Sequence, residues 1–468
     1  MFDFLQGIRQ APLVRPGLNL GCLFDIPTGK YMTGRFGESL LSGGLAHATG
    51  ICGRGNTFKS AIEAFMLERP MDRYPRSAGT FYCTEITAQL PRLQGFLNNY
   101  ATDSMKGVDL THCERFRFTD KTEYNGTAWY EMIKTVTESR AKRQKADLSV
   151  TPFLDRDGSN IEIINPLMVG IDSLSLFTTE AVDKMQDNNA IGDSGRNMEA
   201  MSDGRTKTQM LMELPTLTAK QGLYVLMTAH MGDKHHLDPY APKTKKLSHM
   251  NVNITLKNVP EKFTLLPNNV WWIMGSDVLK NQTTKAPEFP RDASDAMAGD
   301  TDLQLLTLTN LRGKGGPSGL PFELIVSQEE GLKIGLSEFY YLKTYDRFGI
   351  EGNDRNYQLA LCPDINLSRT TIRRKIDESP RLQRALEISS ELCQMRNLWH
   401  HLPAGFLCTP QELFKDLKDQ GYDWDQLLAT RGWWTSDNEK HPIPFLSTMD
   451  MLNMRAKLYR PYWMKKEV

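Results

Sequence analysis

The sequence lacks the cysteine pattern of a disulfide-stabilised or zinc-binding protein. Its seven cysteines are scattered at positions 22, 52, 83, 113, 362, 393 and 408, and none forms a Cys-x-x-Cys pair. Zinc ligands and the cysteines of small secreted domains come in characteristic close spacings, which are missing here. We therefore expect no disulfide framework, no zinc site and reduced, cytosol-like surroundings.

Long apolar stretches are also missing. The N-terminus, MFDFLQGIRQAPLV, has no basic segment followed by an apolar one. Nowhere do the roughly eighteen consecutive apolar residues of a membrane span occur. The expectation is a soluble protein that is not exported and that has no membrane partner.

An excess of charge of one sign is the third absence. Lys+Arg and Asp+Glu each total 56, so the formal net charge is zero and no global positive field marks a nucleic-acid-binding protein. Any binding of DNA must therefore use locally positive segments.

The arrangement of apolar residues predicts an α/β core. Between about 45 and 230, short apolar runs alternate with longer amphipathic ones, which is typical of a mostly parallel sheet with crossover helices. The predicted strands are Ala46–Cys52, Gly79–Cys83, Leu167–Ile171 and Leu223–Thr228. The predicted helices are Ser60–Glu68, Ala88–Tyr100, Thr127–Lys142 and Thr206–Lys220.

Beyond residue 265 the pattern becomes β-rich and predicts an antiparallel extension of the same sheet. The runs are Asn269–Gly275, Leu303–Asn310 and Pro321–Ser327. Three stretches without periodicity are predicted to be functional or disordered loops: Lys184–Arg205, Gly232–Lys262 and Lys280–Asp302.

A length of 468 residues suits one large core with an appendage. After about 345 the composition changes, and five of the eight tryptophans follow, at 399, 424, 433, 434 and 463. We interpret 1–44 as a segment that contacts other subunits, 45–344 as the core, and 345–468 as a small C-terminal accessory domain. The tryptophans suit either a packed core or a surface that docks a partner.

The strongest single motif is Gly53-Arg-Gly-Asn-Thr-Phe-Lys-Ser60, between a predicted strand and a predicted helix. It has the Gly-x4-Gly-Lys-[Ser/Thr] layout of a phosphate-binding loop, except that Phe58 replaces the second glycine. Backbone N–H groups of such a loop cradle a triphosphate, Lys59 reaches the β- and γ-phosphates, and Ser60 binds magnesium. The alternative is a glycine-rich turn without a ligand. The predicted ATP-binding residues here are Gly53, Arg54, Gly55, Asn56, Thr57, Phe58, Lys59 and Ser60.

Three further residues end predicted strands or follow them directly. Asp172 closes the apolar run Leu167–Ile171 and suits the magnesium shell, whereas many buried strands also end in aspartate. Glu85 closes another run and suits the activation of the attacking water; the alternative is an acid that stabilises a helix N-terminus. His230 suits a sensor of the γ-phosphate, or else a structural histidine.

These residues together resemble the RecA superfamily, and most closely the UvsX-like recombinases of T4-type phages. Their phosphate-binding loop also carries Phe-Lys-Ser, as Phe58–Ser60 does. Asp172-Ser173-Leu174 is similar to the family's acidic strand end, Glu85 matches its catalytic glutamate, and His230 matches the histidine of its Asn-His pair. The resemblance covers about 20–343 and implies a RecA-like ATPase core that uses ATP and Mg²⁺. It departs at 280–302 and ends near 345.

The resemblance also implies two DNA-binding loops, near 184–205 and 232–262. Ile191-Gly-Asp-Ser194 is similar to the first, and Gly232–Lys262 carries six lysines against two aspartates and one glutamate. Locally positive, flexible loops bind phosphates without sequence preference, although a solvated loop with incidental lysines is the alternative. The predicted DNA-binding residues are Gly192, Arg196, Asn197, Arg205, Lys234, His235, His236, Lys243, Lys245 and Lys246.

Two other basic segments have weaker interpretations. Arg312 and Lys314 resemble the cations that recombinases extend toward the nucleotide of a neighbouring subunit, although most such residues are solvated. Ser368–Lys375 has the character of a recognition helix of a helix-turn-helix, and an ordinary basic helix is the more common reading.

The resemblance implies a DNA-dependent ATPase that forms filaments on single-stranded DNA and pairs it with homologous duplex. It would act in phage recombination, repair and replication, in the cytoplasm of an infected bacterium, with a mediator or single-strand-binding protein as a further partner. One alternative is a ring-forming RecA-like replicative helicase, suggested by the spacing in Phe81–Leu93 and by Gly315–Gly319. About fifty residues before Gly53 leave no room for the N-terminal collar of such rings. The other alternative is a degenerate RecA-like scaffold.

Overall fold

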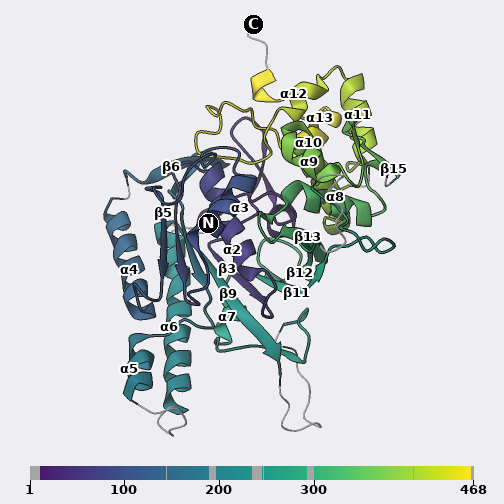
Figure 1. Ribbon diagram of the computed structural model, residues 1–468. Helices are drawn as coiled ribbons and strands as arrows, with labels where there is room; N and C mark the ends of the chain where they lie inside the picture. The colour runs from purple at the N-terminus through teal and green to yellow at the C-terminus, as the bar shows by residue number, and fades with distance from the viewer. Residues whose placement is uncertain are drawn as a thin grey trace.

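A large mixed sheet organises the computed structural model, which describes residues 11–143, 145–188, 197–234, 245, 247–291, 300–353, 355–403 and 405–464 (Figure 1). In this described part, ten strands form the sheet, in the order β14-β13-β12-β11-β3-β9-β8-β4-β5, with β10 beside β9. The strands from β11 to β5 run parallel, and those from β12 to β14 are antiparallel.

The bounds of the parallel strands are Ala48–Gly53 (β3), Ala78–Cys83 (β4), Phe116–Asp120 (β5), Leu167–Asp172 (β8), Leu223–Asp233 (β9) and Asn269–Val278 (β11). The others are Ile254–Leu256 (β10), Leu303–Gly313 (β12), Pro321–Ser327 (β13) and Gly331–Leu332 (β14). The structure therefore confirms an α/β fold with a mostly parallel sheet and an antiparallel extension. It adds β5, which the sequence did not reveal because the five-residue edge strand is half exposed and has no continuous apolar run.

Helices cover both faces of the sheet. On one face α2 (Lys59–Arg73) lies across β3, β9, β8 and β4, with α3 (Leu90–Tyr100) and α8 (Ile334–Thr344) beside it. On the other face lie α4 (Gly126–Lys142), α6 (Asn197–Gln221) and the short α7 (Lys262–Leu265). Both layers are apolar because strand side chains alternate: Ile51 and Trp271 join the first core cluster, and Cys52 and Trp272 join the second.

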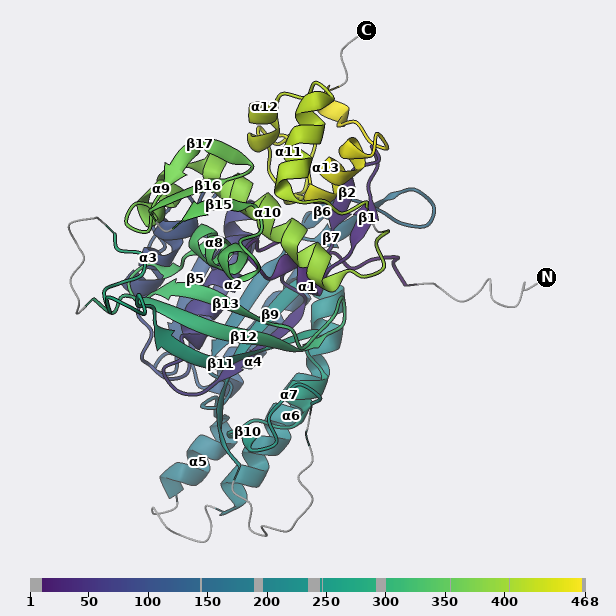
Figure 2. The same ribbon diagram turned by 90° about the vertical axis from the view of Figure 1, so that its right-hand side faces the viewer.

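Small β-units and the C-terminal helices complete the described chain. The hairpins are β1–β2 (Tyr31–Thr33, Ser39–Leu41) and β6–β7 (Leu148–Leu154, Asn160–Ile164), and a three-stranded sheet is formed by β15–β17 (Ile350–Asn353, Asn356–Leu359, Cys362–Leu367). The remaining helices are α1 (Asp25–Thr28), α5 (Glu180–Asn188), α9 (Ile372–Glu378), α10 (Pro380–Leu398), α11 (Pro410–Asp419), α12 (Trp424–Leu428), α13 (Thr448–Arg455) and the 3-10 turn Tyr462–Met464. Helices α9–α13 gather at the end of the molecule opposite α5 (Figures 1 and 2).

The tryptophans of the C-terminal segment are mostly core residues. Trp399, Trp424 and Trp434 are buried, and Trp434 packs against Tyr74 and Phe153 of the N-terminal two thirds. Helix α10 packs on α8 and α1, and one buried cluster runs through all three. The packed-core interpretation of these three tryptophans is thus the one that the structure supports.

Two predicted loops contain more regular structure than expected. Within Lys184–Arg205, α5 continues to Asn188 and α6 begins at Asn197. Figures 1 and 2 show this end of α6 projecting away from the sheet beside α5, and residues 201–205 are exposed or half-buried, which fits a sequence without apolar periodicity. Within Gly232–Lys262, β9 extends to Asp233 and pairs with β10 as a hairpin.

The basic segment Ser368–Lys375 makes structural contacts. Helix α9 has only seven residues, and Arg373 is 3% exposed. Its Nη2 donates to Asp302 Oδ2 at 2.9 Å and Glu330 Oε2 at 2.8 Å, while Arg369 donates to the carbonyl of Pro287 at 2.7 Å. These bonds tie the segment to the Lys280–Asp302 stretch and to β13–β14, so Arg373 and Arg369 are not presented as a recognition surface.

We predict that Arg373→Ala lowers the free energy of unfolding by about 1–3 kcal/mol, because Asp302 and Glu330 each lose a buried hydrogen-bond donor and keep only Arg291 and Lys333 as cationic partners. Arg374→Ala is the matched control: its side chain is 56% exposed and its Nε lies 3.9 Å from Glu378, so the expected change is within about 0.5 kcal/mol. Urea denaturation followed by circular dichroism measures both. Equal effects of the two substitutions would show that the Arg373 pairs do not stabilise the fold.

Candidate active site

Three strands end at one edge of the sheet, and a fourth passes through it. Strand β3 ends at Gly53, which pairs with His230 of β9, and β4 ends at Cys83, which pairs with Asp172 of β8. Strand β9 is paired in parallel with both β3 and β8, and it continues beyond this edge to Asp233. The structure therefore brings the predicted residues Lys59, Ser60, Glu85, Asp172 and His230 to a single edge.

The turn after β3 reaches α2 through left-handed backbone conformations. Asn56 and Phe58 have φ values of 56° and 58°, and Phe58 is the residue that precedes α2. Such a conformation costs a residue with a side chain about 1–2 kcal/mol, and glycine avoids this cost. This explains why glycine is expected at position 58. The partly buried Phe58 ring packs on the main core cluster, which offsets part of the cost.

The carbonyl of Arg54 holds this turn closed on itself. Lys59 Nζ donates to it at 2.7 Å, and Thr57 Oγ1 donates at 2.8 Å. At Gly55, in contrast, no described atom lies within 4 Å of the position of an added Cβ, so the outer side of the turn is open. The Lys59 residue is 6% exposed, and burial lowers the pKa of its ammonium, while the carboxylates of Asp172 and Glu85 act in the opposite direction.

Asp172 lies at the centre of the edge and is 3% exposed. Its Oδ1 accepts a hydrogen bond from Thr228 Oγ1 at 2.7 Å. Burial raises the pKa of Asp172, and hydrogen bonds from Ser60 and Thr228 and the charge of Lys59 oppose that rise. Carboxylate and hydroxyl oxygens are the ligands that Mg²⁺ prefers, so Asp172 and Ser60 are the residues best placed to hold that ion.

A second carboxylate, Glu85, faces the imidazole of His230. Glu85 Oε1 lies 2.6 Å from His230 Nε2, and the two side chains are 23% and 29% exposed. This hydrogen bond lowers the pKa of Glu85 despite partial burial. An ionised Glu85 at neutral pH follows, as a general base requires.

Several residues that the sequence analysis missed support these groups. Thr84 Oγ1 bonds both the Ser173 N–H at 2.7 Å and the Ser173 carbonyl at 2.8 Å, which fixes the end of β8 beside the end of β4. Ser175 Oγ accepts from the His230 N–H at 2.9 Å. Hydroxyl residues are too common in a sequence to single out, so only the fold identifies these positions.

Glu63, one turn after Lys59 in α2, is completely buried below Asp172. Its Oε1 accepts from the Ile171 N–H at 2.8 Å, and Oε2 has no hydrogen-bond partner among the described residues. Burial, and next the charge of Asp172, raise the pKa of Glu63 well above its ordinary value. A glutamate on the apolar face of a predicted helix was the available sequence signal.

Arg312 and Lys314 do not join this group of residues. Arg312 pairs with Val270, which is level with Gly50 in β3, and the Lys314 N–H bonds Asn268 before the start of β11. Both lie toward the amino ends of the parallel strands, away from Gly53. They therefore contact no nucleotide held by the turn of their own chain.

The predicted DNA-binding residues are only partly described. Arg205 is exposed on α6, Lys234 follows β9, and Lys245 is exposed, whereas of Asn197 only the backbone, at the start of α6, is described. The others lie outside the described residues: Gly192, Arg196, His235, His236, Lys243 and Lys246. The β9–β10 hairpin and the α5–α6 pair extend from the same end of the molecule (Figures 1 and 2).

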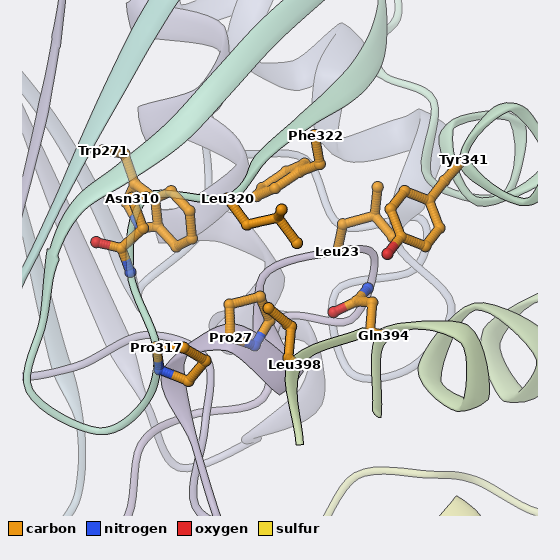
Figure 3. A pocket seen from close by; sticks show the side chains of 11 residues that line it. Leu23, Pro27, Trp271, Asn310, Pro317, Leu320, Phe322, Tyr341, Gln394 and Leu398 are labelled. Carbon is orange, nitrogen blue, oxygen red and sulfur yellow. The ribbon is translucent and has the colours of Figure 1, made fainter. Parts of the chain in front are cut away.

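A small enclosed cavity lies away from this edge (Figure 3). It measures about 20 Å³, room for about one water molecule, between the antiparallel strands, α10 and the N-terminal segment. Leu23, Trp271 and Leu398 line it, and the side-chain amide of Gln394 points toward it without a partner among the described residues. Its size excludes a nucleotide.

Comparison with known proteins gives no match, either to a protein-family model or to a curated protein. Within the described ranges, no helix combines the length and apolarity that crossing a membrane requires. The same residues contain no cluster of three or more His, Cys, Asp or Glu suited to a metal ion.

We predict that Glu63→Gln changes the pH dependence of stability. The raised folded-state pKa of Glu63 contributes stability that is complete below about pH 4.5, its unfolded value, and is lost as the pH rises through the folded value. Glutamine keeps the bond to Ile171 and cannot ionise. Urea denaturation at pH 4 to 8 should show that the free energy of unfolding of the variant rises relative to that of the wild type as the pH increases, by up to about 1.4 kcal/mol per pH unit. A difference independent of pH would contradict this assignment.

Proposed function

We propose that the protein is an ATP-hydrolysing, RecA-like motor, similar to the UvsX-like recombinases, that assembles on single-stranded DNA and promotes homologous pairing and strand exchange. The observation that carries the proposal is the convergence of Lys59, Ser60, Asp172, Glu85 and His230 at the carboxyl edge of β3, β9, β8 and β4. Five residues from four separate segments provide the groups that ATP hydrolysis needs at one edge.

The residues of the turn fit a triphosphate with magnesium. The turn between Gly53 and Ser60 leads into the N-terminus of the fifteen-residue α2 and is open at Gly55, and backbone N–H groups at such a helix start suit an anion. The Lys59 ammonium is bonded to the Arg54 carbonyl of this turn, and we assign it to the phosphates. Ser60 and Asp172 would hold Mg²⁺, which when bound neutralises charge on the phosphates.

Glu85 is the residue that we assign as the base. Its lowered pKa keeps it ionised, so it accepts a proton from the water that attacks the γ-phosphate. The bond to His230 fixes the orientation of the carboxylate. Because His230 belongs to β9 and its carbonyl accepts from the Lys257 N–H at 2.9 Å, a change at Glu85 is transmitted to the β9–β10 hairpin.

The position of the projecting elements supports a DNA partner at the same end of the sheet. Both β9 and β8 lead from the candidate site directly into these elements, the hairpin and the α5–α6 pair (Figure 1). Lysines of the 232–262 segment can bind phosphates if the charge is positive locally. The chain as a whole is neutral, but this segment carries more lysines than acidic residues. Arg312 and Lys314, at the other end of the strands, would reach a nucleotide only in a neighbouring copy of a filament.

We predict that single-stranded DNA stimulates ATP hydrolysis and that Lys59→Ala and Glu85→Gln each reduce the stimulated rate by about 10²–10³-fold, because each removes one group that acts on the reacting phosphate or water. Glu131→Gln, at an exposed carboxylate of α4, is the control and should retain the wild-type rate. Phosphate release is the measurement. If single-stranded DNA does not stimulate phosphate release by the wild type, or if both variants keep the full rate, the result would favour a scaffold without catalysis.

A second prediction separates a recombinase from a ring helicase. Electron micrographs of the protein with single-stranded DNA and ATP should show helical filaments, as the resemblance to the UvsX-like recombinases implies, because head-to-tail contacts that do not close on themselves build filaments. Closed six-membered rings would support the replicative helicase instead.

A further inference from the structure

Arg54 links the turn after β3 to the outer end of the paired part of the β9–β10 hairpin. Its Nη2 lies 2.5 Å from Asp233 Oδ1, and its Nη1 lies 3.3 Å from Oδ2, so the guanidinium and the carboxylate form a two-point contact. Asp233 is the last residue of β9 and pairs with Ile254, the first residue of β10. The contact joins two segments that are 179 positions apart in the sequence.

This ion pair is suited to exchange. The Arg54 and Asp233 side chains are 53% and 65% exposed, and such pairs shift an equilibrium by no more than about fivefold. A phosphate offers the same two-point geometry to a guanidinium, with a larger negative charge. A triphosphate in the turn is therefore a stronger partner for Arg54 than Asp233 is.

The backbone of the turn favours the same exchange. The Arg54 carbonyl accepts bonds from Lys59 Nζ and Thr57 Oγ1 at 2.7 and 2.8 Å. The backbone of Arg54 is therefore part of the turn that would hold the phosphates, and its side chain extends from that turn. The hairpin has its own ties: the Lys234 N–H bonds the Asn253 carbonyl at 2.7 Å, and Lys257 Nζ bonds the Asp233 carbonyl at 3.2 Å. Loss of the Arg54 contact would remove one of the ties at this end of the hairpin and loosen its backbone pairing near Asp233 and Ile254.

We propose that the guanidinium of Arg54 is a further phosphate ligand of the nucleotide, held by Asp233 when no nucleotide is bound, and that transfer of Arg54 to the phosphates releases the outer end of the paired part of the hairpin. The inference rests on the proposed ATP site. It adds a second connection to that site, independent of Glu85 and His230, and makes Asp233 a competitor of the nucleotide.

The test is a double-mutant cycle on nucleotide affinity. Calorimetry with Mg²⁺ and a non-hydrolysable ATP analogue gives the dissociation constants of wild type, Arg54→Gln, Asp233→Asn and the double variant. Asp233→Asn should bind about two- to fivefold more tightly, because the competitor is gone. Arg54→Gln should bind at least about tenfold more weakly, and Asp233→Asn should add nothing in that background.

Asp277→Asn is the matched control, since Asp277 is an exposed aspartate near the end of β11. It should leave the affinity unchanged. If Asp233→Asn tightens binding equally with and without Arg54, or if Asp277→Asn tightens it as much, Asp233 acts only through general repulsion and the proposal is wrong. Failure of the wild type to bind the analogue would instead overturn the ATP site itself.

Hydrogen exchange of the hairpin tests the release directly. Peptides that cover 228–234 and 253–258 should exchange faster when the analogue is added to the wild type. In Asp233→Asn and in Arg54→Gln they should exchange fast already without it. Wild-type exchange that is unchanged by the bound analogue would refute the release of the hairpin.

Discussion

The parallel pairing of β3, β9, β8 and β4 is the constraint on which the candidate site depends. Backbone hydrogen bonds set Gly53 level with His230, and Cys83 level with Asp172, before any side chain is considered. The short polar contacts then follow: Thr228 to Asp172, Thr84 to Ser173, and His230 to Glu85. A one-residue slip of any of these strands would point its side chains to the other face and separate the groups.

Burial gives this edge its chemical character. Asp172 is close enough to both Lys59 and Glu63 to influence their pKa values. Burial disfavours the charged form of all three groups. Among the carboxyl groups of Asp172, Glu63 and Glu85, it is Glu85, more exposed and bonded to His230, whose pKa is lowered. The two carboxylates nearest the turn thus differ in environment: Asp172 suits a hydrogen-bonded or metal-bound role, and Glu85 suits proton transfer.

The far end of α2 is equally constrained. Arg73 donates to the Asn19 carbonyl at 3.0 Å, and its guanidinium lies 4.3 Å from the Trp433 ring. Nearby on α10, Arg384 bonds Glu387 at 2.5 Å, while burial raises the pKa of Glu391 to about 8. The helix that begins at the candidate phosphate turn therefore ends in a polar core shared with the N-terminal and C-terminal segments, which hold it against the sheet.

Local sequence patterns predicted the sheet strands with long apolar runs, α3 and α4 to within two residues, and the order of Lys59, Glu85, Asp172 and His230 along the chain. Helix α2 continues five residues beyond its predicted end, and α6 begins nine residues before its predicted start. These features are local, because periodicity and strand-to-helix turns are written in neighbouring residues. The three-dimensional fold was needed to show that the four strands lie side by side, that Glu63 and Thr228 lie next to Asp172, and that Arg54 contacts Asp233. Those relations join residues far apart in sequence, and the pairing of strands that brings them together leaves no signature in any single segment.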